Sequence, residues 1–215
     1  SAMCNKYLGS IYSFTGDRNK AVEYIYKAMQ ISRQSGDQKT LAKSLQYLGG
    51  IYDEFGDNEN AMSYLTEAAS INTQLGDRIA FAQNNTTIGE LLSEKGSNTK
   101  ALQTLHVSLE IYKQPGAPSW GQTWVFEDIG DVIQNQGDSA NAAGNRQRAN
   151  EKYKEALSNY LVALQKAEEI KDPYFVSDKQ IALGKLYFKM GQIAVAKQFL
   201  LDALKTKKAT QSIAN

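Results

Sequence analysis

The chain contains few cysteines and histidines, which often bind metals or act in catalysis, and few prolines. It has one cysteine (Cys4), one histidine (His106) and three prolines in 215 residues. A single cysteine excludes an internal disulfide, and one histidine leaves too few ligands for a histidine–cysteine metal site. With 24 basic and 23 acidic residues, no net charge favours nucleic acid. No apolar run reaches the roughly 20 residues that a membrane-spanning helix needs. We expect no metal, no nucleic-acid partner and no membrane insertion.

Catalytic motifs are equally scarce. One histidine cannot supply a persuasive Ser-His-Asp or Cys-His arrangement. The segment from Gly116 to Thr123 is similar to a phosphate-binding loop, but Gln122 stands where a lysine must reach the phosphates. The sequence therefore predicts no enzyme and no cofactor. The N-terminus shows no signal-peptide pattern, so we favour a cytoplasmic location. A periplasmic one is the alternative if an export signal has been trimmed.

The glycines and alanines that are present recur at a fixed interval. The glycine spacing is 40 residues through the first three copies and then 41 and 54. One glycine register is Gly9, Gly49, Gly89, Gly130 and Gly184. A second, seven residues later, is Gly16, Gly56, Gly96, Gly137 and Gly191. An alanine register follows at Ala21, Ala61, Ala101, Ala156 and Ala196. Five copies in step indicate an internal repeat.

Each register has a physical role in a helical hairpin. The first glycine lies beside an apolar helical stripe such as Leu48/Tyr52, where a missing side chain lets a second helix approach. The second glycine is suited to ending the helix in a left-handed conformation. The next residue is a good N-cap for the following helix, and the four such residues are Asp17, Asp57, Ser97 and Asp138.

The sequence thus predicts an all-α fold of five antiparallel helical hairpins in one solenoid over residues 1–215. The expected hairpins are about 1–37, 38–77, 78–117, 118–172 and 173–207, with a tail at 208–215. The fourth copy has 14 extra residues at 138–151, which we expect to lengthen its second helix or to form a solvated loop. The alternative for this insertion is a projecting contact element.

The string Leu48-Gly49-x-x-Tyr52, followed by Gly56, Ala61 and Ala68, resembles the tetratricopeptide repeat. The 40-residue period resembles that of the sensing or interaction regions of bacterial signalling regulators. The resemblance implies a right-handed superhelical solenoid. It also implies a non-catalytic scaffold that binds a protein or peptide, as part of a larger signalling protein.

In the family that the chain resembles, the first helices of the hairpins line a concave groove. Residues about two positions before the Leu/Tyr stripe point away from it and toward that groove. Trp124 joins them as an aromatic anchor, with packing beneath the proline-rich turn as the alternative. The predicted partner-binding residues are Lys6, Ser10, Gln46, Asp53, Thr86, Glu90, Glu94, Trp124, Glu127, Asp131, Gln134, Lys185 and Phe188. The middle hairpins carry carboxylates and no base on this face, so we expect a partner segment with a basic centre.

A second class of function remains open at this point. The chain could be a structural or oligomerising module that assembles through its convex face or its end caps, with the groove idle. A peptide bound in the groove would favour the scaffold, whereas self-association without a groove ligand would favour the structural module.

Overall fold

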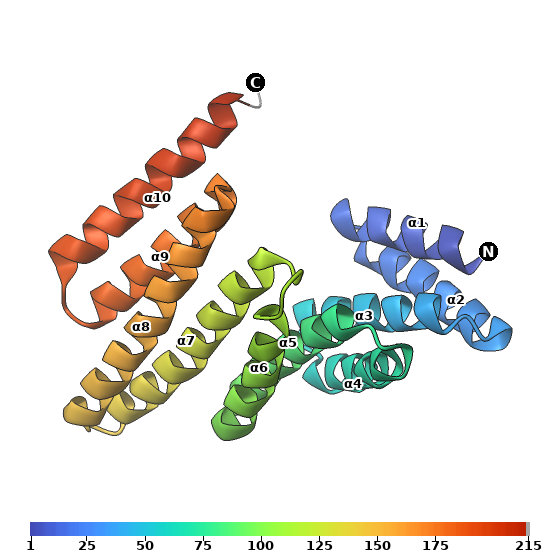
Figure 1. Cartoon of the computed structure of the whole chain (residues 1–215), viewed down its shortest axis with the longest axis horizontal. Helices are drawn as coiled ribbons and strands as arrows, with labels where there is room; N and C mark the ends of the chain where they lie inside the picture. Colours follow the sequence, from blue (N-terminus) through green and yellow to red (C-terminus); the bar gives the residue numbers. More distant parts are fainter. Residues whose placement is uncertain (214–215) are drawn as a thin grey trace. The chain divides into compact units, whose positions relative to one another are not determined.

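The computed structural model describes the backbone of residues 1–213 and the side chains of residues 1–208. Within this range the regular structure consists of ten α-helices and contains no strand (Figure 1). The helices are α1 (Ala2–Phe14), α2 (Arg18–Ser35), α3 (Gln38–Glu54), α4 (Asn58–Leu75), α5 (Arg78–Glu94), α6 (Asn98–Tyr112), α7 (Ser119–Ala142), α8 (Arg146–Ile170), α9 (Pro173–Lys189) and α10 (Ile193–Ile213). The predicted all-α class is confirmed.

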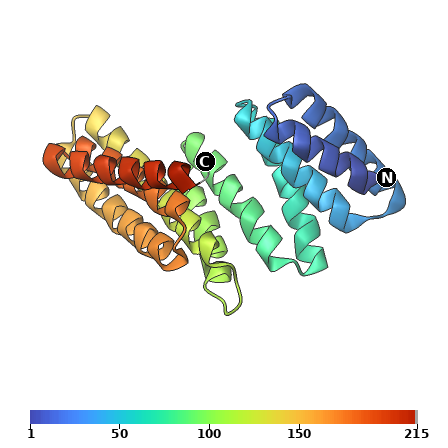
Figure 2. The ribbon, with the colours of Figure 1, turned by 90° about the horizontal axis from the view of Figure 1, so that it is seen from above.

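The chain divides into two compact units, Ser1–Lys95 and Gly96–Asn215. In the first unit α1 packs on α2 and α3 on α4, while α2 contacts α3 and α4 contacts α5 (Figure 2). In the second unit α7 packs on α8 and α9 on α10, while α6 contacts α7 and α8 contacts α9. Each unit is therefore a stack of antiparallel hairpins. A single continuous solenoid over residues 1–215 stays a prediction.

The first glycine register marks the closest approach of the two helices in a hairpin. A Cβ atom on Gly49 would lie 2.5 Å from Cγ of Leu65, and one on Gly184 would lie 2.7 Å from Cγ of Leu200. Gly49 and Leu65 are both buried. The predicted role of this register as a helix contact is confirmed at these positions.

The second register closes the hairpins as predicted in the first two copies. Gly16 and Gly56 follow α1 and α3 with φ of 80° and 72°, which a residue without a Cβ adopts at least cost. Asp17 and Asp57 then accept hydrogen bonds from the backbone N–H groups of the second helix. Ser97 occupies the N-cap of α6 without a side-chain capping bond.

The fourth hairpin departs from the prediction at its turn. Gly137 was expected to end the helix and Asp138 to cap the next one, and both expectations are wrong. α7 continues through Gly137 to Ala142, and the turn falls at Gly144, with φ of 77°. Asn145 is the N-cap of α8 and accepts from the backbone N–H of Arg148 at 3.0 Å.

The physical reason is that the 14 inserted residues are shared equally between the two helices. α7 has 24 residues against 17 in α3, and α8 has 25 against 18 in α4, so each helix gains seven residues, or about two turns. Gly137 therefore marks a second close approach of the two helices, seven residues after the contact glycine Gly130. A Cβ atom there would lie 2.7 Å from Cε1 of Tyr153.

Gly49 and Gly50 are adjacent, and alanine at the two positions should change the free energy of unfolding in opposite directions if Gly49 marks a helix contact. We expect Gly49→Ala to lower the free energy of unfolding by about 1–3 kcal/mol, because the added methyl overpacks the contact with Leu65. Gly50 lies in the same helix and has nothing within 4 Å of an added Cβ. Gly50→Ala should therefore raise that free energy by about 0.5–1 kcal/mol through helix propensity. Urea unfolding of the two variants checks both signs, and equal effects would contradict the contact role.

Candidate functional site

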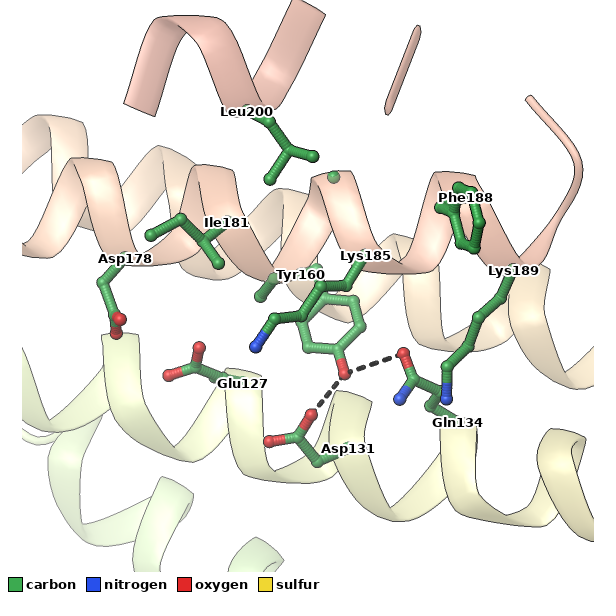
Figure 3. A pocket seen from close by; sticks show the side chains of 12 residues that line it. Glu127, Asp131, Gln134, Tyr160, Asp178, Ile181, Lys185, Phe188, Lys189 and Leu200 are labelled. Carbon is green, nitrogen blue, oxygen red and sulfur yellow. Dashed lines mark hydrogen bonds between the residues drawn. The ribbon is translucent and has the colours of Figure 1, made fainter. Parts of the chain in front are cut away.

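A hollow of about 710 Å³ lies in the second unit between α7 and α9, and we call it the α7–α9 pocket. Figure 3 shows how side chains from four helices surround it. Its labelled lining residues are Glu127, Asp131 and Gln134 of α7, Tyr160 of α8, Asp178, Ile181, Lys185, Phe188 and Lys189 of α9, and Leu200 of α10. The pocket thus combines carboxylates, lysines and apolar side chains.

Its apolar side chains come from α9 and α10. Ile181 and Phe188 lie on α9, and Leu200 reaches in from α10 (Figure 3). Phe188 is 64% exposed and Leu200 is 43% exposed, although both are large apolar residues. Exposed apolar groups that line a hollow are a common feature of surfaces that receive a partner.

The polar floor is organised by Tyr160. Its buried hydroxyl donates a hydrogen bond to Oδ1 of Asp131 and lies 3.5 Å from Oε1 of Gln134. Burial raises the pKa of Tyr160, and the neighbouring negative charge of Asp131 adds to the effect. Burial also raises the pKa of Asp131, although the hydrogen bond from Tyr160 and the nearby lysines oppose that shift. Asp131 is therefore oriented by Tyr160 at the edge of the hollow.

A buried ion pair lies at one end of the pocket. The side chain of Lys179 on α9 is 1% exposed, and its ammonium pairs with Glu127 on α7 and with Oδ2 of Asp178 at 3.0 Å. Desolvation lowers the pKa of Lys179, but the two carboxylates together outweigh it and the pKa is raised overall. Burial raises the pKa of Glu127, against the opposing effect of Lys179.

A second cation–carboxylate contact lies at the other end. Nζ of Lys189 on α9 is 2.5 Å from Oδ2 of Asp138 on α7. The hydroxyl of Tyr153 on α8 donates to the other oxygen of Asp138 at 2.8 Å. Burial and this hydrogen bond raise the pKa of Tyr153 to about 12. Asp138, predicted to be a helix cap, instead ties three helices together.

The structure brings together five of the predicted partner-binding residues. They are Glu127, Asp131, Gln134, Lys185 and Phe188, which all line the α7–α9 pocket. Trp124 is not among the lining residues. It is 40% exposed and packs between Trp120 and Phe175, with ring centroids 4.7 Å and 6.0 Å away.

The remaining predicted residues lie in the first unit, on α1, α3 and α5. Lys6, Ser10, Gln46, Asp53, Glu90 and Glu94 are at least partly exposed there. Thr86 was also expected to face a partner, but it is buried. It is 7% exposed, and its hydroxyl donates to the carbonyl of Ala82 at 2.9 Å. Burial raises the pKa of Asp53, and the like charges of Glu94 and Glu54 raise it further. Oε2 of Glu94 accepts a hydrogen bond from Asn58 at 2.8 Å.

Sequence reasoning missed Tyr160, Lys179 and Lys189 as parts of the site. For Lys179 a signal existed, because it lies five residues before the contact glycine, as do Ser44 and Asn84. All three side chains are buried polar groups. A lysine at a position that is buried in earlier copies indicates a carboxylate nearby, since a charge is seldom buried without a partner.

Neither a metal centre nor a membrane span is found in the part of the chain that the structure describes. No three histidine, cysteine or acidic side chains there are grouped so as to hold a metal ion. No described helix is both long and apolar enough to cross a membrane.

Family models decide what kind of protein this is. Models described as "Tetratricopeptide repeat" match residues 2–74 and residues 180–210. The chain is a tetratricopeptide repeat protein. No curated protein matches it at the level of sequence.

Solved structures share the fold of this tetratricopeptide repeat protein. A Rap protein complexed with competence and sporulation factor has a TM-score of 0.77 and 18% identity, over 94% of this chain and 52% of that one. A signal-transduction ATPase with a tetratricopeptide repeat sensor, from Pyrococcus horikoshii, has a TM-score of 0.68 and 19% identity, over 99% of this chain and 30% of that one. BtubC from P. vanneervenii has a TM-score of 0.58 and 18% identity, over 95% of this chain and 78% of that one.

These likenesses confirm the predicted solenoid class, and the chain spans about half the length of the Rap protein. Tetratricopeptide repeats stack into scaffolds that present extended binding surfaces. The class of function that follows is a protein-interaction scaffold, and such repeats are generally non-catalytic.

The buried pair of Lys179 and Glu127 makes a testable contribution to stability. Lys179→Met should lower the free energy of unfolding by about 3 kcal/mol at neutral pH, because it leaves the half-buried Glu127 carboxylate without its cation. The pKa of Glu127 is already raised in the folded state, so the folded protein binds that proton more tightly than the unfolded chain does. The loss should therefore shrink as the pH falls through that raised pKa.

Urea unfolding between neutral and mildly acidic pH measures this effect. Adding Glu127→Gln to the Lys179→Met variant should recover much of the loss and remove its pH dependence. Lys185→Met serves as the matched control, since Lys185 lies on the same helix and is exposed. A loss that does not change with pH would contradict the assignment to Glu127.

Proposed function

We propose that this chain is the peptide-binding sensor region of a larger regulatory protein, and that the α7–α9 pocket contacts the peptide. The observation that carries the proposal is the pocket itself. It offers an exposed aromatic ring, Phe188, beside a carboxylate, Asp131, that Tyr160 holds in place. Such a site can take an apolar side chain and an adjacent polar or charged one from the same segment.

Two relatives of the fold support a sensing role. One Rap structure is a complex with competence and sporulation factor, and the archaeal ATPase is described as having a tetratricopeptide repeat sensor. A solenoid whose repeats touch only their neighbours can transmit binding as a change in repeat packing. A ligand that favours one packing would then bias whatever the solenoid is attached to.

The charges of the site favour a segment with a basic residue. Lys179 neutralises Glu127 within the protein, which leaves Asp131 as the carboxylate oriented at the edge of the hollow. Seating a ligand cation against Asp131 would offset the desolvation that raises its pKa. In the first unit, the pKa of Asp53 is likewise raised by burial and by Glu94 and Glu54, so a cation would also be favoured there.

A random peptide display library, selected against the whole chain, tests the proposal. We expect enriched peptides to pair an apolar residue with a lysine or arginine. Phe188→Ala should weaken such a peptide by about tenfold or more, as expected for an aromatic residue central to an interface. Fluorescence polarisation with a labelled selected peptide measures the change.

The matched control for Phe188 is Tyr174→Ala. Tyr174 lies on the same helix, is 65% exposed against 64% for Phe188, and does not line the pocket. The Tyr174→Ala substitution should leave the affinity for the selected peptide unchanged. Peptides that respond equally to both variants, or a selection that enriches no peptide, would refute the proposed site.

The same peptide should bind with a pH dependence set by Asp131. Because the folded pKa of Asp131 is raised, the carboxylate is protonated at a higher pH than an ordinary aspartate. Affinity for a basic peptide should therefore decline as the pH falls through that raised value. In Asp131→Asn the affinity should be weaker at neutral pH and should lose this part of the dependence. An unaltered pH profile in the variant would rule out Asp131 as the contact.

A further inference from the structure

Two adjoining polar hollows in the second unit share no lining residue with the α7–α9 pocket. Their volumes are about 620 Å³ and 350 Å³, and Asn98, Gln136 and Arg148 line both of them. We call the two together the α6–α8 hollow, because they lie among the start of α6, the end of α7 and the start of α8. Three basic side chains line it, Lys100, Arg148 and Lys152, and none of its described lining residues has a carboxylate.

The 14 residues inserted in the fourth hairpin build most of this hollow. α5 ends at Glu94, five residues after its contact glycine, and the equivalent residue of α7 is Asn135. The α7 residues in the lining all lie beyond that point, from Gln136 onward. Arg148 and Lys152 belong to the seven residues, 146–152, by which α8 exceeds α4 at its start. The insertion thus places new side chains beside the start of α6.

The helix caps at this hollow lack the negative charge that the caps of most other helices carry. The N-cap of α2, α3, α4, α5 and α9 is an aspartate whose side chain accepts a backbone hydrogen bond. The N-caps of α6 and α8 are Ser97 and Asn145, which are neutral. Both of these residues line the hollow. Carboxylates are therefore absent at two places where the fold usually has one.

Two basic side chains consequently lack the partner that the repeat supplies elsewhere. Lys20 stands three residues after the cap of α2, and its Nζ lies 2.9 Å from Oδ2 of that cap, Asp17. Lys100 and Arg148 also stand three residues after their own caps, but those caps are neutral. Among residues 1–208, whose side chains the structure describes, none forms a salt bridge or hydrogen bond with the side chain of Lys100 or Arg148.

The acidic side chains that lie nearby on α8 do not supply the missing charge. Glu155 pairs with Lys152 at 2.7 Å, and Glu151 accepts a hydrogen bond from Gln147 at 3.1 Å. Neither carboxylate lines the hollow. Two positive charges therefore remain uncompensated at a concave surface, and such a surface attracts and concentrates ligands of the opposite charge.

We propose that the α6–α8 hollow binds an acidic protein segment, with its carboxylates against Arg148 and Lys100. The guanidinium of Arg148 can hold a carboxylate through two parallel hydrogen bonds, and Lys100 adds a point charge. Amide and hydroxyl groups of Gln136 and Ser139 lie beside them and can bond a peptide backbone. The second unit would thus accept an acidic segment here and a basic one at the α7–α9 pocket.

A protein segment fits this hollow better than a nucleic acid does. None of the described lining residues is aromatic, so the hollow offers no ring on which a base could stack. The chain as a whole has a net charge of only +1, which gives no extended field for a phosphate backbone. The uncompensated charge is local, as suits a short acidic segment.

A fluorescein-labelled oligoglutamate peptide, added to the whole chain at low ionic strength, tests the proposal by fluorescence polarisation. Lys100→Gln and Arg148→Gln should each weaken binding about two- to fivefold, which is the range for exposed ion pairs, and the double variant should be weaker still. Arg146→Gln is the matched control. Arg146 is exposed on the same helix as Arg148, loses the same charge and does not line the hollow.

Ser97→Asp separates binding from folding. It restores the carboxylate that the repeat usually has at this cap, so it should neutralise Lys100 as Asp17 neutralises Lys20 and weaken oligoglutamate binding about two- to fivefold. Because Ser97 makes no side-chain capping bond, the new aspartate should also raise the midpoint of urea unfolding. Weaker binding by a more stable variant cannot result from misfolding.

The outcomes that would overturn the proposal are distinct from those that bear on the α7–α9 pocket. Phe188→Ala should leave oligoglutamate binding unchanged, because Phe188 does not line the α6–α8 hollow. No binding of oligoglutamate would overturn the proposal, as would an equal loss in Arg146→Gln and Arg148→Gln or full affinity in Ser97→Asp. Tighter binding of oligodeoxythymidylate than of oligoglutamate through the same residues would assign the hollow to nucleic acid and would also overturn it.

Discussion

The structure depends on the close approach of two helices at the contact glycine of each hairpin. The space left by the missing side chain is filled by one large residue of the second helix, such as Ile25 beside Gly9 or Leu65 beside Gly49. In the fourth hairpin that residue is Tyr160, and a Cβ atom on Gly130 would lie 2.9 Å from its ring. The same packing of a large residue against the contact glycine therefore also places the Tyr160 hydroxyl beside Asp131.

The candidate site follows from this exchange of an aliphatic side chain for tyrosine. A hydroxyl that is buried needs a hydrogen-bond partner, and Asp131 supplies one from α7. The carboxylates of α7 in turn require cations, which α9 provides as Lys179 to Glu127 and Lys189 to Asp138. Polar groups along one face of α7 are therefore held in place from both neighbouring helices, while Phe188 and Leu200 remain open beside them.

The hairpins could be predicted from sequence because glycine and alanine recur at spacings that only helix contacts explain. The turn of the fourth hairpin could not, because Gly130, Gly137 and Gly144 are seven residues apart and the contact and turn roles share that spacing. Only the packing of Gly137 on Tyr153 separates them. Helical periodicity likewise placed five residues around the pocket. Lys179 was missed because its partner Glu127 is 52 positions away, beyond the reach of any local pattern.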